Sequence, residues 1–234
     1  MPNSWFRFKQ FAIHHDRCAH KVGTDGVLLG AWVRASNPLN ILDIGSGSGL
    51  ISLMMALRFA NASVTGIELD FESYQQSLEN VKASPFANRV SIFQGDFLEY
   101  NFGAQQFDLI LSNPPFFNQA FLSGHQSRDQ ARHTAHLSHH HLLQKASALL
   151  KDTGSINLIL PVNESVAILA DTELSLSRKT SVYNKPQGEL KRFLLEFKPT
   201  GNGIMEESSI AIRNEDGDFS TEYQNLTRHF YLHF

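Results

Sequence analysis

The stretch that decides the fold is residues 40–49, which read NILDIGSGSG. Its first five residues form an apolar run typical of a buried parallel strand, and the rest places glycine at every second position. Leu50 to Phe59 then reads as a helix that is apolar nearly all round. Glycines between a strand and a helix let the backbone approach a ligand closely, where any Cβ would clash. The stretch therefore predicts a strand, a ligand-binding loop and a helix in direct succession.

The same alternation of strands and helices continues along the chain. We expect strands at residues 40–44, 62–67, 89–94, 107–111 and 155–160, a hairpin pair at 178–182 and 192–197, and a candidate for one more strand at 208–212. We expect helices at residues 27–33, 50–59, 71–82, 138–150 (N-capped by Ser138 and followed by Gly154), 164–174 and 223–232. This alternation predicts an α/β fold, namely a doubly wound, mostly parallel, seven-stranded Rossmann-like sheet with a C-terminal antiparallel hairpin and a short N-terminal extension.

The N-terminal extension is interpreted as an arm of residues 1–36 that precedes a main domain of residues 37–234, the two forming a single globular unit. Residues 5–13 mix aromatic and basic side chains in near alternation, which favours a short strand or hairpin. Thr24 or Asp25 is expected to cap the helix that follows. Such an arm, folded over a bound cofactor, would shield it from water.

Composition predicts a soluble cytoplasmic protein. Cys18 is the single cysteine, so no intrachain disulfide can form and a reducing compartment is the natural fit. The first ten residues contain no apolar signal-peptide core, and the chain has no run of eighteen apolar residues. The net charge of −3 does not indicate general nucleic-acid binding. Residues 1–34 hold a local excess of basic side chains, which favours a compact RNA feature over a long duplex.

Polar side chains follow four successive expected strands at the point where each one ends. They are Asp43, Glu68, Asp96 and Asn113. Parallel doubly wound sheets bind ligands at the carboxyl ends of their strands, near the switch in strand order. Four such residues at four strand ends predict one ligand site far more strongly than any one of them would alone.

The chemistry of these residues favours S-adenosyl-L-methionine over a dinucleotide. Asp43 precedes the glycines by two positions, which suits a ligand with cationic groups better than a pyrophosphate. Gly45, Gly47 and Gly49 are spaced GxGxG rather than GxGxxG. Glu68 is placed to accept both ribose hydroxyls, and Asp96 to accept from an adenine amino group.

The fourth strand runs into Asn113-Pro114-Pro115-Phe116, a stiff loop that presents an amide, carbonyl groups and an aromatic face. Neither proline can donate a backbone hydrogen bond, and the first pushes Asn113 out of the α region. Asn113 Oδ1 and the Pro114 carbonyl could accept both hydrogens of a planar amino group while Phe116 stacks on its ring. Residues 118–137 then form a loop that is long for a compact domain, which indicates a functional or mobile segment.

These motifs resemble the class I S-adenosylmethionine-dependent methyltransferases of the amino-methylating branch. Four N-terminal sequences and the segment 223–234 make the resemblance specific to one family. The four sequences are FKQF (8–11), HDRCA (15–19), KVGTDG (21–26) and LLGAW (28–32). Together they resemble the bacterial tRNA(Val) adenine-37 N6-methyltransferase family along essentially the whole chain. Phe117 is one departure, because the family often has tyrosines there.

The resemblance implies transfer of a methyl group from S-adenosylmethionine to N6 of an anticodon-loop adenine by a cytoplasmic monomer that binds the tRNA anticodon stem-loop. It adds Thr24 and Asp25 to the expected cofactor-binding residues, which are Asp43, Gly45, Gly47, Gly49, Glu68, Asp96 and Asn113. The expected catalytic residues are Asn113, Pro114, Pro115 and Phe116. The expected substrate-binding residues are Phe116, Phe117, Arg128, Arg132, Arg17 and Lys21.

Other interpretations keep methyl transfer to nitrogen and change the acceptor, which would then be a release-factor glutamine, a ribosomal RNA guanine N2 or a DNA adenine. Two more distant interpretations are a non-catalytic S-adenosylmethionine-binding module and a dinucleotide-dependent oxidoreductase. About forty residues precede Asp43, too few for the helical domain of the glutamine enzymes. The cluster His133, His136, His139, His140 and His141 has spacings compatible with metal ligands, but no cysteine or obvious carboxylate accompanies it, so we expect no metal site.

Overall fold

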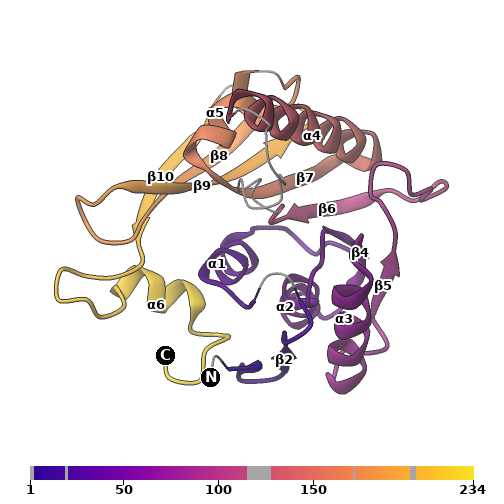
Figure 1. Ribbon diagram of the computed structural model, residues 1–234, viewed down its shortest axis with the longest axis horizontal. Coiled ribbons are helices and arrows are strands. Elements are labelled where there is room, and N and C mark those ends of the chain that lie inside the picture. The colour runs from indigo at the N-terminus through magenta and orange to yellow at the C-terminus, as the bar shows by residue number, and fades with distance from the viewer. Residues whose placement is uncertain (1–2, 19–20, 115–127, 171, 201–203) are drawn as a thin grey trace.

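The stretch at residues 40–49 folds as strand β3 (Asn40–Ile44) and a glycine loop, which leads into helix α2 (Leu50–Arg58), in a computed structural model of the protein (Figure 1). The structure describes the chain except residues 1–2, 19–20, 115–127, 171 and 201–203. The next elements are strand β4 (Ser63–Glu68), helix α3 (Phe71–Ala83), strand β5 (Val90–Gln94) and strand β6 (Phe107–Ser112). After them come helix α4 (Arg128–Leu149), strand β7 (Leu150–Pro161), helix α5 (Val162–Ala170), strands β8 (Ser175–Tyr183), β9 (Leu190–Lys198) and β10 (Glu206–Ala211), and helix α6 (Thr221–Thr227).

The main sheet has the order β10-β8-β9-β7-β6-β3-β4-β5. Its strands are parallel except β9, which lies antiparallel between β7 and β8 and makes the predicted hairpin. The predicted mixed, mostly parallel α/β fold is confirmed. Within the described residues the sheet has eight strands rather than the expected seven, because the candidate strand at 208–212 forms as β10 and pairs parallel to β8.

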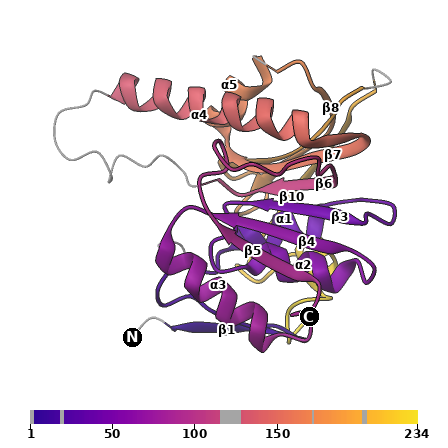
Figure 2. The same ribbon diagram turned by 90° about the vertical axis from the view of Figure 1, so that its right-hand side faces the viewer.

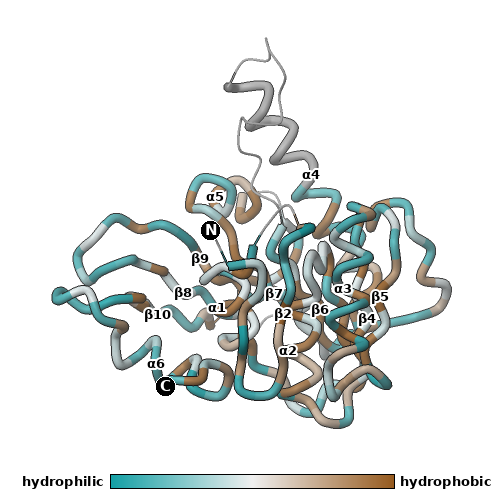
Figure 3. Tube along the Cα trace, turned by 60° about the horizontal axis from the view of Figure 1, so that its bottom comes forward, coloured by the Kyte–Doolittle hydropathy of each residue, from teal (hydrophilic) through white to brown (hydrophobic). Residues whose placement is uncertain are grey.

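Helices cover both faces of this sheet. Helices α1 (Thr24–Trp32), α2, α3 and α6 lie on one face, and α4 and α5 lie on the other (Figures 1 and 2). Each face therefore has its own core, one built on α1 and α2 and the other on α4, α5, β7 and β9. Hydrophobic residues follow the central strands and α2, as expected for strands buried on both sides (Figure 3). In the part of the chain that is described, we find no helix long and apolar enough to cross a membrane.

The N-terminal residues form the predicted hairpin, with β1 (Trp5–Arg7) antiparallel to β2 (Ala12–His14). Phe8 and Phe11 at its turn are buried, and Phe8 stacks on Tyr231 of the C-terminal segment. The turn of the N-terminal hairpin therefore packs against the C-terminal segment. The Lys9 ammonium group donates to two backbone carbonyls of that segment, at 2.6 and 2.9 Å. These hydrogen bonds stabilise the contact between the hairpin and the C-terminal segment.

Several predicted helix boundaries are wrong. Helix α1 begins at Thr24 with Gly23 as N-cap and without a side-chain capping bond, so neither Thr24 nor Asp25 caps it. Helix α4 begins at Arg128, which places Ser138 inside the helix and leaves residues 128–137 helical rather than looped. The mixed polar and histidine-rich sequence there lacks the apolar periodicity that would reveal a helix.

Three further boundaries differ from the prediction. Strand β7 begins at Leu150, so Gly154 lies in a strand, where a Cβ would come within 3.0 Å of the Asp108 carbonyl oxygen. Helix α5 ends at Ala170. Helix α6 ends at Thr227, because Phe230 and the residues after it turn back into the aromatic core.

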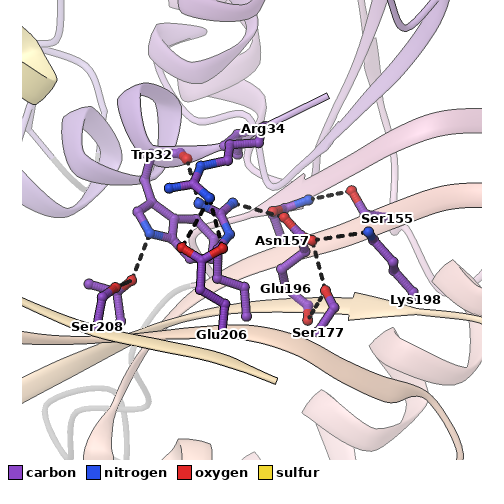
Figure 4. A network of polar contacts seen from close by, with 12 residues as sticks. Trp32, Arg34, Ser155, Asn157, Ser177, Glu196, Lys198, Glu206 and Ser208 are labelled. Atoms are coloured by element: carbon purple, nitrogen blue, oxygen red, sulfur yellow. Dashed lines mark hydrogen bonds and ion pairs between the residues drawn. The ribbon is translucent and has the colours of Figure 1, made fainter. Parts of the chain in front are cut away.

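A buried polar network holds the C-terminal end of α1 on the sheet, at the edge where the parallel strands begin (Figure 4). The Arg178 guanidinium lies 3.5 Å from the centre of the Trp32 ring and donates to Glu196 Oε2 at 2.8 Å. The Trp32 indole donates to Thr180 Oγ1 at 2.8 Å. Arg34, just after the helix, donates to both carboxylate oxygens of Glu206. These contacts join the first 36 residues to β8, β9 and β10.

Candidate cofactor and catalytic site

Four strand ends that carry polar residues meet at one edge of the sheet. Strands β6, β3, β4 and β5 are parallel neighbours in that order, so their carboxyl ends lie side by side. Backbone hydrogen bonds join the segments that follow them. The amides of Gly45 and Ser46 donate to the Ile67 carbonyl at 2.9 and 3.0 Å, and the Gly95 amide donates to the Glu68 carbonyl at 2.9 Å.

The loop after β3 has a backbone that only glycine adopts easily. Gly45, Gly47 and Gly49 have φ values of 69°, 54° and 81°. Among the described residues, no atom lies within 4 Å of a Cβ built on Gly45 or Gly47. The two glycines therefore border open space at the strand ends, as a loop that admits a ligand must.

Asp43 is fully buried at the end of β3. Its Oδ2 accepts from the Ser52 hydroxyl at 2.6 Å, whereas its Oδ1 has no hydrogen-bond partner among the described residues. Burial raises the pKa of Asp43 to about 7, although the hydrogen bonds from Ser52 favour the carboxylate. A buried carboxylate oxygen without a partner fits a ligand that brings a positive charge, and S-adenosylmethionine carries both a sulfonium and an ammonium group.

Glu68 joins the ends of β3 and β4. Its Oε2 accepts from the Gly47 amide at 2.7 Å, and its Oε1 accepts from the Asp70 amide at 2.9 Å. One backbone donor on each oxygen leaves lone pairs for further donors such as ribose hydroxyls. Asp96 is exposed after β5, and its Oδ1 accepts from the Leu98 amide at 2.8 Å, which fixes the direction of the carboxylate.

Asn113 follows β6, the strand next to β3, and so lies beside the glycine loop. Its Oδ1 is buried and has no hydrogen-bond partner in the described part of the chain. Its Nδ2 faces the first turn of α1, where a Cβ built on Gly26 would lie 3.9 Å away. Pro114 is buried next to it. The predicted residues Pro115, Phe116 and Phe117 lie outside the described residues.

The predicted residues of the N-terminal part fall in two places. Thr24 and Asp25 lie in the first turn of α1, and Asp25 Oδ2 accepts from Arg192 Nε of β9 at 2.9 Å. The Arg17 guanidinium pairs with Glu79 of α3, and this hydrogen bond raises the Arg17 pKa. Its charge is therefore engaged within the fold.

The other basic candidates differ in how far the structure describes them. Lys21 is exposed. Arg128 and Arg132 lie in the first turns of α4, but their side chains lie outside the described residues. The RNA contacts expected of the four basic residues stay predictions; these residues are Arg17, Lys21, Arg128 and Arg132. Of the predicted histidine cluster, His139 is buried with Nε2 at 3.6 Å from Glu164 Oε2.

Two residues beside the site were not predicted from the sequence. Asn80 of α3 donates to the carbonyls of His14 and Ser48 at 2.8 and 2.9 Å, so it ties the N-terminal hairpin to the glycine loop. Arg192 holds Asp25. Neither belongs to a local motif, and each contacts residues far away in the chain, so no short sequence pattern could have revealed them.

Replacing Asp43 by asparagine is expected to flatten the dependence of stability on pH in the cofactor-free protein. The Asp43 pKa is about 7 in the folded protein against an ordinary value of 3.8, so folding favours the protonated form. This stabilising contribution is complete below pH 3.8 and is lost progressively as the pH rises to about 7. Urea unfolding across this range measures the free energy of unfolding of both proteins.

The matched variant is Ser52→Ala, which removes a donor that favours the Asp43 carboxylate. It is expected to raise the Asp43 pKa further, so that the loss of stability extends to higher pH. Equal slopes of unfolding free energy against pH in the wild type and the Asp43→Asn variant would contradict this assignment.

Comparison with known proteins is consistent with this geometry. Residues 21–172 match the family model described as "Methyltransferase small domain". Proteins named tRNA1(Val) (adenine(37)-N6)-methyltransferase are similar along their whole length. That of Bacteroides thetaiotaomicron is 38% identical over 100% of this chain and 99% of its own, and that of Phocaeicola vulgatus is 42% identical over 99% of each. The protein of that name from Aeromonas hydrophila is 42% identical over 98% of each chain.

Solved structures share the fold at low sequence identity. A predicted O-methyltransferase from Agrobacterium tumefaciens superposes with a TM-score of 0.70 at 17% identity, over 88% of this chain and 96% of its own. A glycopeptide N-methyltransferase in complex with S-adenosylmethionine has a TM-score of 0.55 at 13% identity, over 78% of this chain and 90% of its own.

Proposed function

We propose a substrate and a mechanism for this chain on the premise that it belongs to the tRNA1(Val) (adenine(37)-N6)-methyltransferase family of class I S-adenosylmethionine-dependent enzymes. It transfers a methyl group from S-adenosylmethionine to the exocyclic N6 of adenine 37 in the anticodon loop of tRNA(Val). One observation carries the mechanism: the Asn113 Oδ1 acceptor is buried and lacks a partner among the described residues, at the strand edge that carries the glycine loop.

The residues of β3, β4 and β5 would hold the cofactor. The cofactor supplies a methyl group already activated by its sulfonium. The glycine loop would let the backbone come close to it, and the Asp43 carboxylate would face its positive charge. Glu68 would accept from its ribose hydroxyls and Asp96 from its adenine amino group, while Thr24 and Asp25 would serve its methionine end.

Asn113 orients the acceptor nitrogen. The lone pair of adenine N6 is delocalised into the ring, so the free nucleobase is a poor nucleophile. Asn113 Oδ1 and the Pro114 carbonyl accept the two N6 hydrogens, which draws the nitrogen towards tetrahedral geometry. Such positioning can contribute part of the ~7–11 kcal/mol available from orientation. The N6 proton leaves to water after transfer, so no strong general base is required.

The rest of the RNA site lies around this edge. The target base must be unstacked to reach Asn113, which costs least from a loop. Phe116 and Phe117 stack on the base, and Lys21, Arg128 and Arg132 contact the phosphates of the anticodon stem-loop. Arg17 would join them only by exchanging its partner Glu79 for a phosphate. The N-terminal arm shields the cofactor from water, and the enzyme acts as a monomer in the cytoplasm.

The experiment is methylation of bulk tRNA, from a strain that lacks the enzyme, with methyl-labelled S-adenosylmethionine. We expect label in tRNA(Val) as N6-methyladenosine at position 37, located by nuclease digestion and mass spectrometry. A tRNA(Val) transcript with guanine at position 37 is the matched control and should take no label. Label in release factor or ribosomal RNA, with none in tRNA, would refute the acceptor and retain the chemistry.

A further inference from the structure

An ion pair joins the first turn of α1 to the hairpin strand β9, next to the catalytic edge. Arg192 Nε donates to Asp25 Oδ2 at 2.9 Å, and both side chains are about three-quarters buried, with exposed fractions of 28% and 23%. Arg192 lies opposite Pro161, the last residue of β7, so it stands at the carboxyl edge of the sheet. The pair therefore lies on the same edge of the sheet as Asn113.

Gly26, the residue after Asp25, lies near the Asn113 side chain and near Leu50 of α2. A Cβ built on Gly26 would lie 3.9 Å from Asn113 Nδ2 and 3.2 Å from Leu50 Cδ2. The first turn of α1 thus lies beside the side-chain amide of Asn113, with room for little more than a methyl group between them, and is held by Arg192. A shift of this turn would change the space into which the Asn113 amide can rotate.

The first turn has little else within the helix to fix it. Its N-cap, Gly23, supplies no side-chain hydrogen bond, and the first helical bond, from the Val27 amide to the Gly23 carbonyl, is long at 3.4 Å. The opposite end of α1 is anchored separately, by the Trp32 and Arg178 contacts. Asp25 suits the positive end of the helix dipole, and its ion pair with Arg192 ties the turn to β9 of the sheet.

We propose that Arg192 is a positioning residue for methyl transfer, which acts through Asp25 to hold the first turn of α1 against the Asn113 amide. This inference rests on the proposed function, because it assigns Asn113 the orientation of the acceptor nitrogen. In this role Arg192 needs no contact with the cofactor or the base. Its guanidinium also lies within electrostatic reach of Glu164 of α5, whose pKa it lowers against the stronger effect of burial.

The test is a double-mutant cycle on the full-length protein with Arg192→Gln, Asp25→Asn and the double variant. Arg192→Gln is expected to lower kcat about 10- to 100-fold, the loss that follows a small misplacement of a reacting group. For Arg192→Gln, KM for tRNA and the calorimetric affinity for S-adenosylmethionine should be unchanged. Asp25→Asn alters a proposed cofactor residue and is expected to weaken S-adenosylmethionine binding as well, so kcat is compared at saturating cofactor. The double variant should lose no more than the worse single variant, because both remove one interaction. Arg192→Lys, which keeps the charge, should recover part of the activity.

The matched control is Arg34→Gln, which removes the ion pair with Glu206 at the other end of α1. It should leave kcat unchanged. A rise in KM for tRNA with constant kcat would make Arg192 an RNA contact and overturn the proposal. An equal loss in Arg34→Gln, additive losses in the double variant, or unchanged kcat in Arg192→Gln would also overturn it. Wild-type transfer to tRNA(Val) tests the proposed function separately, and the variants are compared with the wild type on whichever acceptor it methylates.

Discussion

Asn113→Ala is expected to lower the rate of methyl transfer by about two to three orders of magnitude, the loss typical when one preorganised hydrogen-bond partner of a reacting centre is removed. Alanine leaves the backbone and Pro114 in place but deletes the buried Oδ1 acceptor. The acceptor nitrogen would then keep its delocalised lone pair and lose its fixed direction towards the methyl group. Single-turnover methylation of tRNA(Val) measures this loss without interference from product release.

Cofactor binding separates this role from a collapse of the site. Calorimetry should give nearly the same affinity for S-adenosylmethionine in Asn113→Ala as in the wild type, because the glycine loop and Glu68 are untouched. Ser112→Ala is the matched control: the Ser112 hydroxyl donates to the Ile44 carbonyl at 2.8 Å and is therefore already engaged within the sheet. Near wild-type transfer by Asn113→Ala would refute the proposed mechanism.

The strand ends were predictable because two local patterns determine them. Apolar runs reveal buried parallel strands, and topology brings the carboxyl ends of neighbouring parallel strands to one edge. The sequence therefore predicts that the polar residues at these strand ends share one edge, without knowledge of any side-chain contact. They are Asp43, Glu68, Asp96 and Asn113. The antiparallel hairpin of β8 and β9 was also predictable, because its two strands follow one another in the chain.

The residues that hold the site in place were not predictable. Asp25 and Arg192 are 167 residues apart, and Asn80 contacts His14 across 66 residues, so each contact depends on the completed fold. The start of α4 was missed because its first turns lack an apolar stripe. The capping role expected for Thr24 or Asp25 is wrong because the helix begins at Thr24, three residues before the expected start, and Asp25 pairs with a distant strand instead.

The N-terminal hairpin shows how such distant contacts reach the site. Asn80 accepts from the His14 amide and donates to the His14 and Ser48 carbonyls, so one side chain joins β2 to the glycine loop. A buried side chain that satisfies three backbone groups can be replaced only at the cost of leaving some of them unpaired. The hairpin is thereby coupled to the conformation of the loop that faces the cofactor, and this supports the proposal that the arm covers that site.

Glu68→Ala is expected to weaken the affinity for S-adenosylmethionine by about 10²-fold, since hydrogen bonds to a charged group each contribute about 1.5–3 kcal/mol. The variant removes the acceptor for the two ribose hydroxyls. It also removes the acceptor of the Gly47 and Asp70 amides, which lie 2.7 and 2.9 Å from the carboxylate. A loss of affinity alone would therefore not distinguish contact with the ribose from support of the loop.

A cycle on the ligand makes that distinction. Calorimetry compares S-adenosylhomocysteine with its 2′-deoxy analogue in the wild type and in the Glu68→Ala variant. If Glu68 accepts from the ribose, the wild type should prefer the hydroxylated ligand strongly, and the variant should hardly discriminate between the two. If Glu68 only supports the loop, both proteins should lose the same free energy on deletion of the hydroxyl, and the ribose assignment falls.

Glu68→Gln is the matched variant, because it keeps one carbonyl acceptor in a side chain of the same size. Its preference should lie between the two, since a neutral acceptor forms weaker hydrogen bonds than a carboxylate.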